Sequence, residues 1–202
     1  MGLFVAVDGP NGVGKSTLIY KLALKLKESF VVYTTKEPSD SELGKRVRKN
    51  EENIRGLEYA KLITEDRIWH LANEIMPQKD NCDIVVSDRY IASSLALQAF
   101  DGLSLDEIWD LNKELVLPDL NIILLADEDV IEKRLNEREH LTFFEKEMSR
   151  HQELVYYQNA YKFLELKGVN SILLYNNSEN ALDSNIDKLI IILNALYKIQ
   201  NL

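Results

Sequence analysis

Short apolar runs alternate with longer amphipathic stretches along the chain. The short runs are rich in β-branched residues, as buried strands are, whereas the longer stretches repeat apolar residues at helical spacing. The predicted strands are Leu3–Asp8, Phe30–Thr35, Asp83–Ser87, Leu120–Ala126 and Ser171–Tyr175. The predicted helices are Lys15–Glu28, Glu58–Ile75 (ended by Pro77), Ala92–Ala99, Ser104–Leu115, Asp129–Arg138, about Phe144–Leu166, and Ala181–Ile199.

This alternation of strands and helices indicates an α/β fold, because successive parallel strands need a crossover helix between them. Strands that are apolar throughout further indicate a five-stranded parallel sheet with helices on both faces, which is a three-layer arrangement. The chain has 202 residues and no linker rich in Gly, Pro and Ser. We therefore expect one domain over residues 1–202.

Composition narrows the class of protein. A formal net charge of −9 opposes contact with a nucleic-acid backbone, so no nucleic-acid partner is expected. No apolar run is long enough to cross a bilayer, and the N-terminus lacks the basic start of a signal peptide, so no membrane attachment is expected. The single cysteine, Cys82, cannot form an internal disulfide, which fits a cytoplasmic location.

The run between the first predicted strand and the first predicted helix matches the phosphate-binding pattern G-x-x-x-x-G-K-[ST] in full. Its glycines let the backbone approach an anion, and its N–H groups and the helix N-terminus direct positive charge at it. We expect Lys15 to reach the β- and γ-phosphates of ATP, Ser16 to hold Mg²⁺, and Thr17 to contact the α-phosphate. The predicted ATP-binding residues are Gly9, Pro10, Asn11, Gly12, Val13, Gly14, Lys15, Ser16 and Thr17.

Other polar clusters fall where a parallel sheet brings them to one edge. Asp88 and Arg89 directly follow the third predicted strand, and Lys36–Pro38 follows the second. Ligands bind at the carboxyl ends of strands in such sheets, so these side chains should share a crevice with Lys15. Asp88 could hold Mg²⁺ there, directly or through water, and Arg89 could bind a phosphate with two hydrogen bonds. A further pair, Asp66-Arg67, lies on the long predicted helix.

In order and spacing, these motifs resemble the thymidylate kinase family over most of the chain. That family combines a P-loop, an Arg-Glu-Pro motif after the second strand, a Phe-x-x-x-Arg helix, an Asp-Arg-Tyr/His motif before a Ser-rich helix, and a phosphate-closing lid. The matching residues are Gly9–Thr17, Lys36–Pro38, Ile63–Arg67, Asp88–Tyr90, Ser93, Ser94, Gln98, Pro118-Asp119 and Arg134–Arg138. The resemblance implies a three-layer P-loop kinase fold with a short lid around 134–147.

The resemblance also implies an activity: transfer of the γ-phosphate of ATP to a nucleoside monophosphate, most simply dTMP to give dTDP, with Mg²⁺. It assigns catalysis to Lys15, Asp88, Arg89 and Arg138, the metal to Ser16 and Asp88, and the lid to Arg134 and Arg138. It assigns acceptor binding to Asn11, Lys36, Glu37, Pro38, Ile63, Arg67, Arg89, Ser94 and Gln98. It implies a homodimer as well, for which the helices at Ala92–Ala99 and around Ile68 offer apolar surfaces.

Several positions depart from the family pattern, most of them on the acceptor side. Asn11 stands where the family has an acidic residue that contacts the acceptor sugar, Ile63 stands for a stacking Phe, and Lys36 stands for Arg. Asn is uncharged and also donates, and Lys lacks the two-pronged geometry of Arg. In the lid, Thr142–Glu145 stands where the family often has Asp-Arg-Phe-Glu. Either dTMP or a different or modified (deoxy)nucleoside monophosphate is therefore open as the acceptor.

Two other functions share part of the pattern. A deoxynucleoside kinase needs a general base for the sugar hydroxyl, and Glu37 could supply one. A nucleotide-binding regulatory module would also carry the P-loop, although the chain lacks the N-K-x-D run of a GTP switch.

Overall fold

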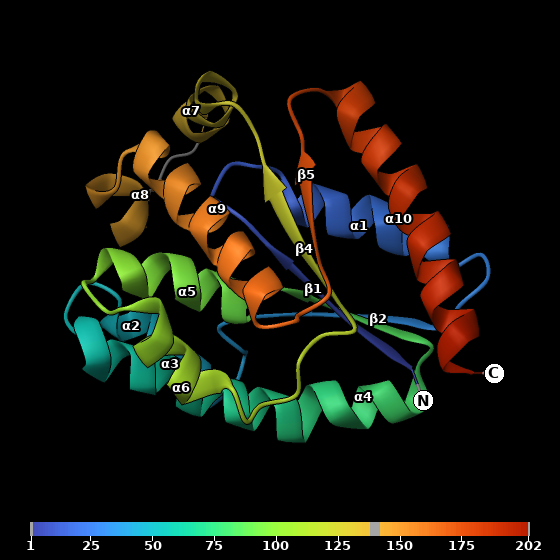
Figure 1. The fold of residues 1–202 in the computed structure, drawn as a ribbon, viewed down its shortest axis with the longest axis horizontal. Coiled ribbons are helices and arrows are strands. Elements are labelled where there is room, and N and C mark those ends of the chain that lie inside the picture. The colour runs from blue at the N-terminus through green and yellow to red at the C-terminus, as the bar shows by residue number, and fades with distance from the viewer. Residues whose placement is uncertain (1, 138–141, 202) are drawn as a thin grey trace.

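The computed structural model describes residues 2–137 and 142–201 and arranges them as strands alternating with helices (Figure 1). Over these ranges the strands are β1 (Leu3–Asp8), β2 (Val32–Lys36), β3 (Ile84–Asp88), β4 (Leu120–Leu125) and β5 (Ser171–Tyr175). The helices are α1 (Lys15–Leu26), α2 (Glu42–Asn50), α3 (Gly56–His70), the π-helix η1 (Leu71–Ile75), α4 (Met76–Asn81), α5 (Ile91–Phe100), α6 (Leu105–Asn112), α7 (Glu128–Asn136), α8 (Phe143–Glu147), α9 (Arg150–Leu166) and α10 (Glu179–Gln200).

The sheet is parallel, with the strand order β2-β3-β1-β4-β5. β1 lies in the middle, and its residue Val7 is in register with Asp88 of β3. The loop that follows β1 and the residues that follow β3 therefore leave the sheet at the same edge, side by side. The parallel α/β sheet expected from the sequence is confirmed.

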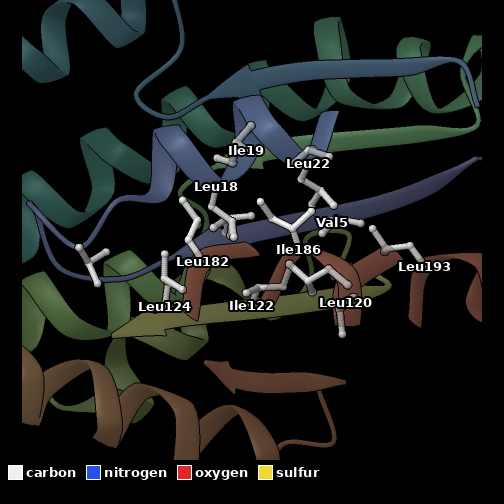
Figure 2. Packing of buried hydrophobic residues seen from close by; sticks show 14 of the residues in the cluster. Val5, Leu18, Ile19, Leu22, Leu120, Ile122, Leu124, Leu182, Ile186 and Leu193 are labelled. Atoms are coloured by element: carbon white, nitrogen blue, oxygen red, sulfur yellow. The ribbon is translucent and has the colours of Figure 1, made fainter. Parts of the chain in front are cut away.

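Two apolar cores lie on opposite faces of the sheet, because successive residues of a strand point to opposite sides. Leu3, Val5 and Val7 of β1 face α1 and α10, in the layer that Figure 2 shows from close by. Phe4 and Ala6 face the other side, against α5, α9 and η1. Helices thus cover both faces, as the three-layer arrangement requires.

Helix α5 is part of this interior rather than of the surface. Ala92, Leu95 and Ala96 are 0% exposed, so the stretch Ala92–Ala99 does not offer the apolar surface expected of it. Ile68 of α3, by contrast, is 50% exposed, and Trp69 beside it is 36% exposed. Within the residues that the structure describes, no helix combines the length and apolar character needed to cross a membrane.

Two local expectations are wrong, and one helix was missed. Pro77 does not end the long helix: the chain stays helical through the π-turn η1 into α4, whose first turn holds Pro77. The wider bonds of the π-turn, such as that from the N–H of Met76 to the carbonyl of Leu71, carry the helix to a residue without an N–H. The expected helix over Phe144–Leu166 is two helices, because Ser149 accepts the N–H of Gln152 and starts α9 with a new cap. Helix α2 was not expected; it buries little apart from Val47 and begins where Ser41 accepts the N–H of Gly44.

Candidate active site

The P-loop is fixed in place by its neighbours. Gly14 caps α1 with a φ of 98°, and a Cβ there would lie 2.5 Å from Nδ2 of Asn176. The same Nδ2 donates to the carbonyl of Val13 at 2.7 Å, and Nη1 of Arg134 donates to that carbonyl at 3.1 Å. The loop therefore presents its N–H groups in a geometry set before any ligand arrives, as an anion site requires.

Lys15 lies at the centre of this cradle. Its side chain curls over the loop, and Nζ donates to the carbonyls of Gly9 and Pro10, both at 2.9 Å. Burial and the positive charge of Arg89 lower the pKa of Lys15 to about 7. A phosphate that replaces these carbonyl contacts would favour the charged form, so binding and protonation of Lys15 are linked.

Ser16 and Asp88 form a site suited to Mg²⁺. The Ser16 hydroxyl donates to Oδ2 of Asp88 at 3.0 Å. The other oxygen, Oδ1, is buried and has no hydrogen-bond partner among the described residues. A hydroxyl beside an unpaired carboxylate oxygen, at the mouth of a phosphate loop, matches the oxygen ligands and bound phosphates that Mg²⁺ prefers. These two residues would hold the ion.

Arg89 points into the site from a strained backbone position. Its φ is 76°, which is uncommon for a residue other than glycine, and its N–H bonds the carbonyl of Val7 at 2.9 Å. Nη1 donates to Ser93 and to the hydroxyl of Tyr157, and Nη2 donates to Oδ1 of Asn11. Burial alone would lower the pKa of Arg89, but the surrounding acidic groups raise it, so the guanidinium stays charged.

Two cavities open from this point. The larger, of about 660 Å³, runs along the P-loop and is bounded by Lys15, Ser16, Asp88 and Arg134. The smaller, of about 390 Å³, lies between α2, α3, α5 and α8. The two cavities share three lining residues, which are Asn11, Glu37 and Arg89. A group bound in one cavity can therefore reach a group bound in the other beside Arg89.

Arg67 forms a buried, charged wall of the smaller cavity. It is 2% exposed, and Nε and Nη2 donate to Oε2 of Glu37 at 2.9 and 2.7 Å. Its other contacts are the side chains of Asn112 and Ser94 and the carbonyl of Tyr90. Burial would raise the pKa of Glu37, but Arg67 and His70 outweigh it and lower that pKa. Glu37 is therefore an ionised partner of Arg67 and a weak base.

Gln98 is the polar group in this cavity that most clearly lacks a partner. It is 1% exposed, and neither Oε1 nor Nε2 has a hydrogen-bond partner among the residues described. Buried amides are normally paired, so a ligand that supplies both a donor and an acceptor would complete this one. Ser94 and Ile63 line the same cavity, together with Pro38.

Aromatic side chains reach this cavity from positions that the sequence analysis did not single out. Tyr59 lies one turn before Ile63 on α3, and Phe144 comes from α8. The cavity therefore has aromatic walls even though Ile63 itself is aliphatic. Spacing could have indicated Tyr59, because residues four apart share a helix face.

Lys36 does not line the smaller cavity. It is exposed, lines the larger cavity, and its Nζ lies 3.3 Å from Oδ1 of Asp40. It stands at the rim beside Glu37, which lines both cavities.

The segment expected as a lid is described in part. Arg134 is bound to the P-loop itself: its Nη1 donates to the carbonyl of Val13 and its Nη2 to the carbonyl of Asn176, both at 3.1 Å, at the wall of the larger cavity. Arg138 lies outside the described residues. Helix α8 is held by Arg55, whose guanidinium lies 3.8 Å from the ring centre of Phe143 and 4.7 Å from that of Phe144.

Further residues of the site were missed. Asp8, the last residue of β1, accepts the N–H groups of Tyr90 and Ser93 and so caps the N-terminus of α5. Asp8 and Asn176 each end or directly follow a strand, so the strand-end rule that found Asp88 could have found both. Glu153 sits on α9 among polar residues that read as a solvated helix face, and no sequence signal marked it.

Comparison with known proteins agrees with this geometry. The family model for thymidylate kinase matches residues 7–186. A probable thymidylate kinase of Caldivirga maquilingensis is 38% identical over 151 residues, which cover 72% of this chain and 74% of that protein. One of Thermococcus gammatolerans is 36% identical over 185 residues, covering 85% and 89%. The crystal structure of thymidylate kinase from Ehrlichia chaffeensis has the same fold, with a TM-score of 0.71 over 96% of this chain and 98% of its own, at 21% identity.

The P-loop cavity opens onto a second cavity beside Arg89, and the matched family and relatives make the protein a nucleoside monophosphate kinase, one class of P-loop enzyme. The family model covers most of the chain, and the relatives align over most of its length. The chain belongs to the thymidylate kinase family.

Proposed function

We propose that this protein transfers the γ-phosphate of ATP to dTMP, giving dTDP and ADP. The observation that carries the proposal is the meeting of two cavities at Asn11, Glu37 and Arg89. The larger cavity, with the P-loop, suits the triphosphate, and the smaller one suits a nucleotide acceptor. The family to which the chain belongs supports dTMP as that acceptor.

In the proposed reaction no side chain of the protein forms a covalent bond. A phosphate oxygen of dTMP attacks the γ-phosphorus, and the bond from that phosphorus to the β–γ bridging oxygen breaks and leaves ADP. Lys15 binds the β- and γ-phosphates, and Arg89 holds the acceptor phosphate in line and offsets repulsion between the two anions. Mg²⁺ held by Ser16 and Asp88 would supply further positive charge to the donor phosphates. Residues 134–147, including Arg138, are proposed to close over them.

The smaller cavity favours a base with the hydrogen-bonding edge of thymine. Arg67 carries donors and no acceptor, and Nη1 has a second hydrogen beyond the one directed at Asn112. It therefore suits a ring carbonyl rather than an amino group. Gln98 offers an acceptor for a ring N–H and a donor for a second carbonyl. Thymine or uracil presents this pattern, whereas cytosine presents an amino group and an unprotonated ring nitrogen.

The geometry argues against a deoxynucleoside kinase. Its general base would be Glu37, but Oε2 of Glu37 accepts two hydrogen bonds from Arg67 and Oε1 lies 3.5 Å from Nδ1 of His70. The lowered pKa of Glu37 makes it still less suited to accept a proton.

Initial rates with ATP against dTMP, dUMP, dCMP, dAMP, dGMP and thymidine test the proposal. We expect dTMP to give the highest kcat/KM and thymidine to give no turnover. A higher kcat/KM for another nucleotide, or for thymidine, contradicts it.

Three further properties belong to the same proposal: dependence on Mg²⁺, a cytoplasmic location and a homodimer. Chelation with EDTA should abolish turnover, and added Mg²⁺ should restore it. The exposed Ile68 and Trp69 of α3 are the apolar residues proposed to lie between the two subunits. Sedimentation of wild type and of Ile68→Glu tests this, because the substitution should shift a dimer towards monomer.

A further inference from the structure

A buried carboxylate, Glu153 of α9, lies inside the phosphate-binding region. Its side chain is 1% exposed. Oε1 accepts the backbone N–H of Asn11, at the tip of the P-loop, at 3.1 Å. Oε2 accepts Nη1 of Arg150 at 3.3 Å. A carboxylate at this place opposes the binding of phosphate, so a task beyond packing is expected of it.

Arg150 carries the connection to the wall of the acceptor cavity. Its Nη2 donates to the carbonyl of Met148 at 3.0 Å and to the carbonyl of Glu145. These carbonyls belong to the last turn of α8 and the residue that follows it. The same short helix contributes Phe144 to the smaller cavity, and Thr142 at its cap also lines that cavity.

Asn11 carries the connection onward to Arg89, the residue proposed to hold the acceptor phosphate. Its backbone N–H is held by Glu153, while its side-chain Oδ1 accepts a hydrogen bond from Arg89. The contacts therefore run without a break from α8 through Arg150, Glu153 and Asn11 to Arg89. Charge-assisted hydrogen bonds in a buried setting are strong and directional, so these contacts form one continuous link between the two cavities.

We propose that Glu153 is a positioning residue that couples the two cavities, so that a bound acceptor strengthens binding of the donor and a bound donor strengthens binding of the acceptor. The inference rests on the proposed function, because it takes dTMP as the ligand of the smaller cavity. An acceptor that packs against α8 and binds Arg89 fixes both ends of the path. The tip of the P-loop is then already in place when the donor binds.

The variant Glu153→Gln tests the coupling with little change of shape. Its amide oxygen can still accept the N–H of Asn11, but its NH₂ group faces the guanidinium of Arg150, and two donors cannot pair. Calorimetry would give the Kd of a non-hydrolysable ATP analogue with Mg²⁺, alone and with saturating dTMP. The coupling ratio is the Kd of the analogue alone divided by its Kd with dTMP. We expect this ratio to be about five or more in wild type and about 1 in the variant.

Two further readouts separate positioning from a merely structural role. In Glu153→Gln each ligand alone should bind within about threefold of wild type, while kcat falls about tenfold, because alignment is lost rather than affinity. Glu165→Gln, on an exposed turn of the same helix, is the matched control and should keep the wild-type ratio and kcat. Equal weakening of both ligands with an unchanged ratio would show that Glu153 is only structural and would overturn the proposal.

A second variant guards against misfolding of the first. Arg150→Met removes the same connection from its other end, at a side chain that is 16% exposed, and should also bring the ratio to about 1. A ratio retained in either folded variant, or a ratio of 1 in wild type, overturns the coupling. Turnover of dTMP by wild type is measured alongside, and its absence contradicts the proposed function. If wild type turns over dTMP but a folded variant keeps the wild-type ratio, only the inference is contradicted.

Discussion

The donor half and the acceptor half of the site are built in different ways. The donor half is one continuous loop, Gly9–Ser16, whose N–H groups and single lysine can bind phosphate wherever that loop follows a strand and opens a helix. The acceptor half draws side chains from α2, α3, α5 and α8, and its central ion pair, Arg67 with Glu37, is buried. The donor half can therefore lose a side chain without harm to the fold, whereas the acceptor half is part of the interior.

The largest expected effect falls on the donor half. Lys15→Ala should lower kcat/KM by about 10³-fold or more, because it removes the charge that binds the transferring phosphate. The melting temperature should stay close to that of wild type, because the residue carries a desolvated amine rather than a packing contact. Lys25→Ala is the control, since Lys25 lies on the same helix and pairs with Asp187 at the surface. A rate near that of wild type for Lys15→Ala would contradict the assignment.

The second prediction tests whether the acceptor half belongs to the interior. Arg67→Met leaves the carboxylate of Glu37 buried without its arginine, which should reduce the free energy of unfolding by about 3–5 kcal/mol. The KM for dTMP should rise as well, because a donor to the base is lost. Denaturant unfolding and steady-state kinetics measure the two effects.

The double variant Arg67→Met/Glu37→Gln separates the two effects. Removing both charges should recover most of the stability, because no unpaired buried charge remains, but the KM for dTMP should stay high. If Arg67→Met is as stable as wild type, the acceptor half is not part of the interior in the predicted energetic sense.

The same contrast explains which parts of the molecule could be predicted from sequence. Gly9–Ser16 is contiguous, and Asp88 and Arg89 follow a strand, so local pattern and the strand-end rule suffice to place them. Gln98 could be named only through the family resemblance, because its pairing depends on how α5 packs. Glu153 depends on how helices distant in sequence pack, and it has no local signature. The break at Ser149 was missed for a related reason, since a helical period continues through it and only the cap of α9 marks the boundary.

Burial and the charge of Arg89 lower the pKa of Lys15 from the ordinary 10.5 to about 7, and this gives the donor half a pH dependence. Between these values the folded protein without ligand binds fewer protons than the unfolded chain, so this group makes the folded state more stable as the pH rises. Nucleotide binding requires the charged amine and should weaken by up to about tenfold per pH unit above 7.

Calorimetry of ADP binding at pH 8, in buffers with different ionisation enthalpies, checks this prediction. We expect uptake of up to about one proton per ADP bound by wild type and none by Lys15→Met. The same series with dTMP should show no uptake that depends on Lys15, since the smaller cavity does not include it. Equal uptake in wild type and Lys15→Met would assign the proton to another group.

The smallest expected effect concerns Ile63, which lies in the wall of the acceptor cavity. Ile63→Phe supplies the stacking ring that the family pattern has at this position, and a ring contact is worth about 0.5–1.5 kcal/mol beyond area burial. The cavity already contains Tyr59 and Phe144, so we expect the lower end of this range, a decrease of about twofold to threefold in the KM for dTMP. The KM for ATP should not change, because Ile63 does not line the larger cavity. Ile63→Leu is the matched control of similar volume and should leave both KM values unchanged. A rise in the KM for dTMP in Ile63→Phe would mean that the aromatic walls already fill the space around the base.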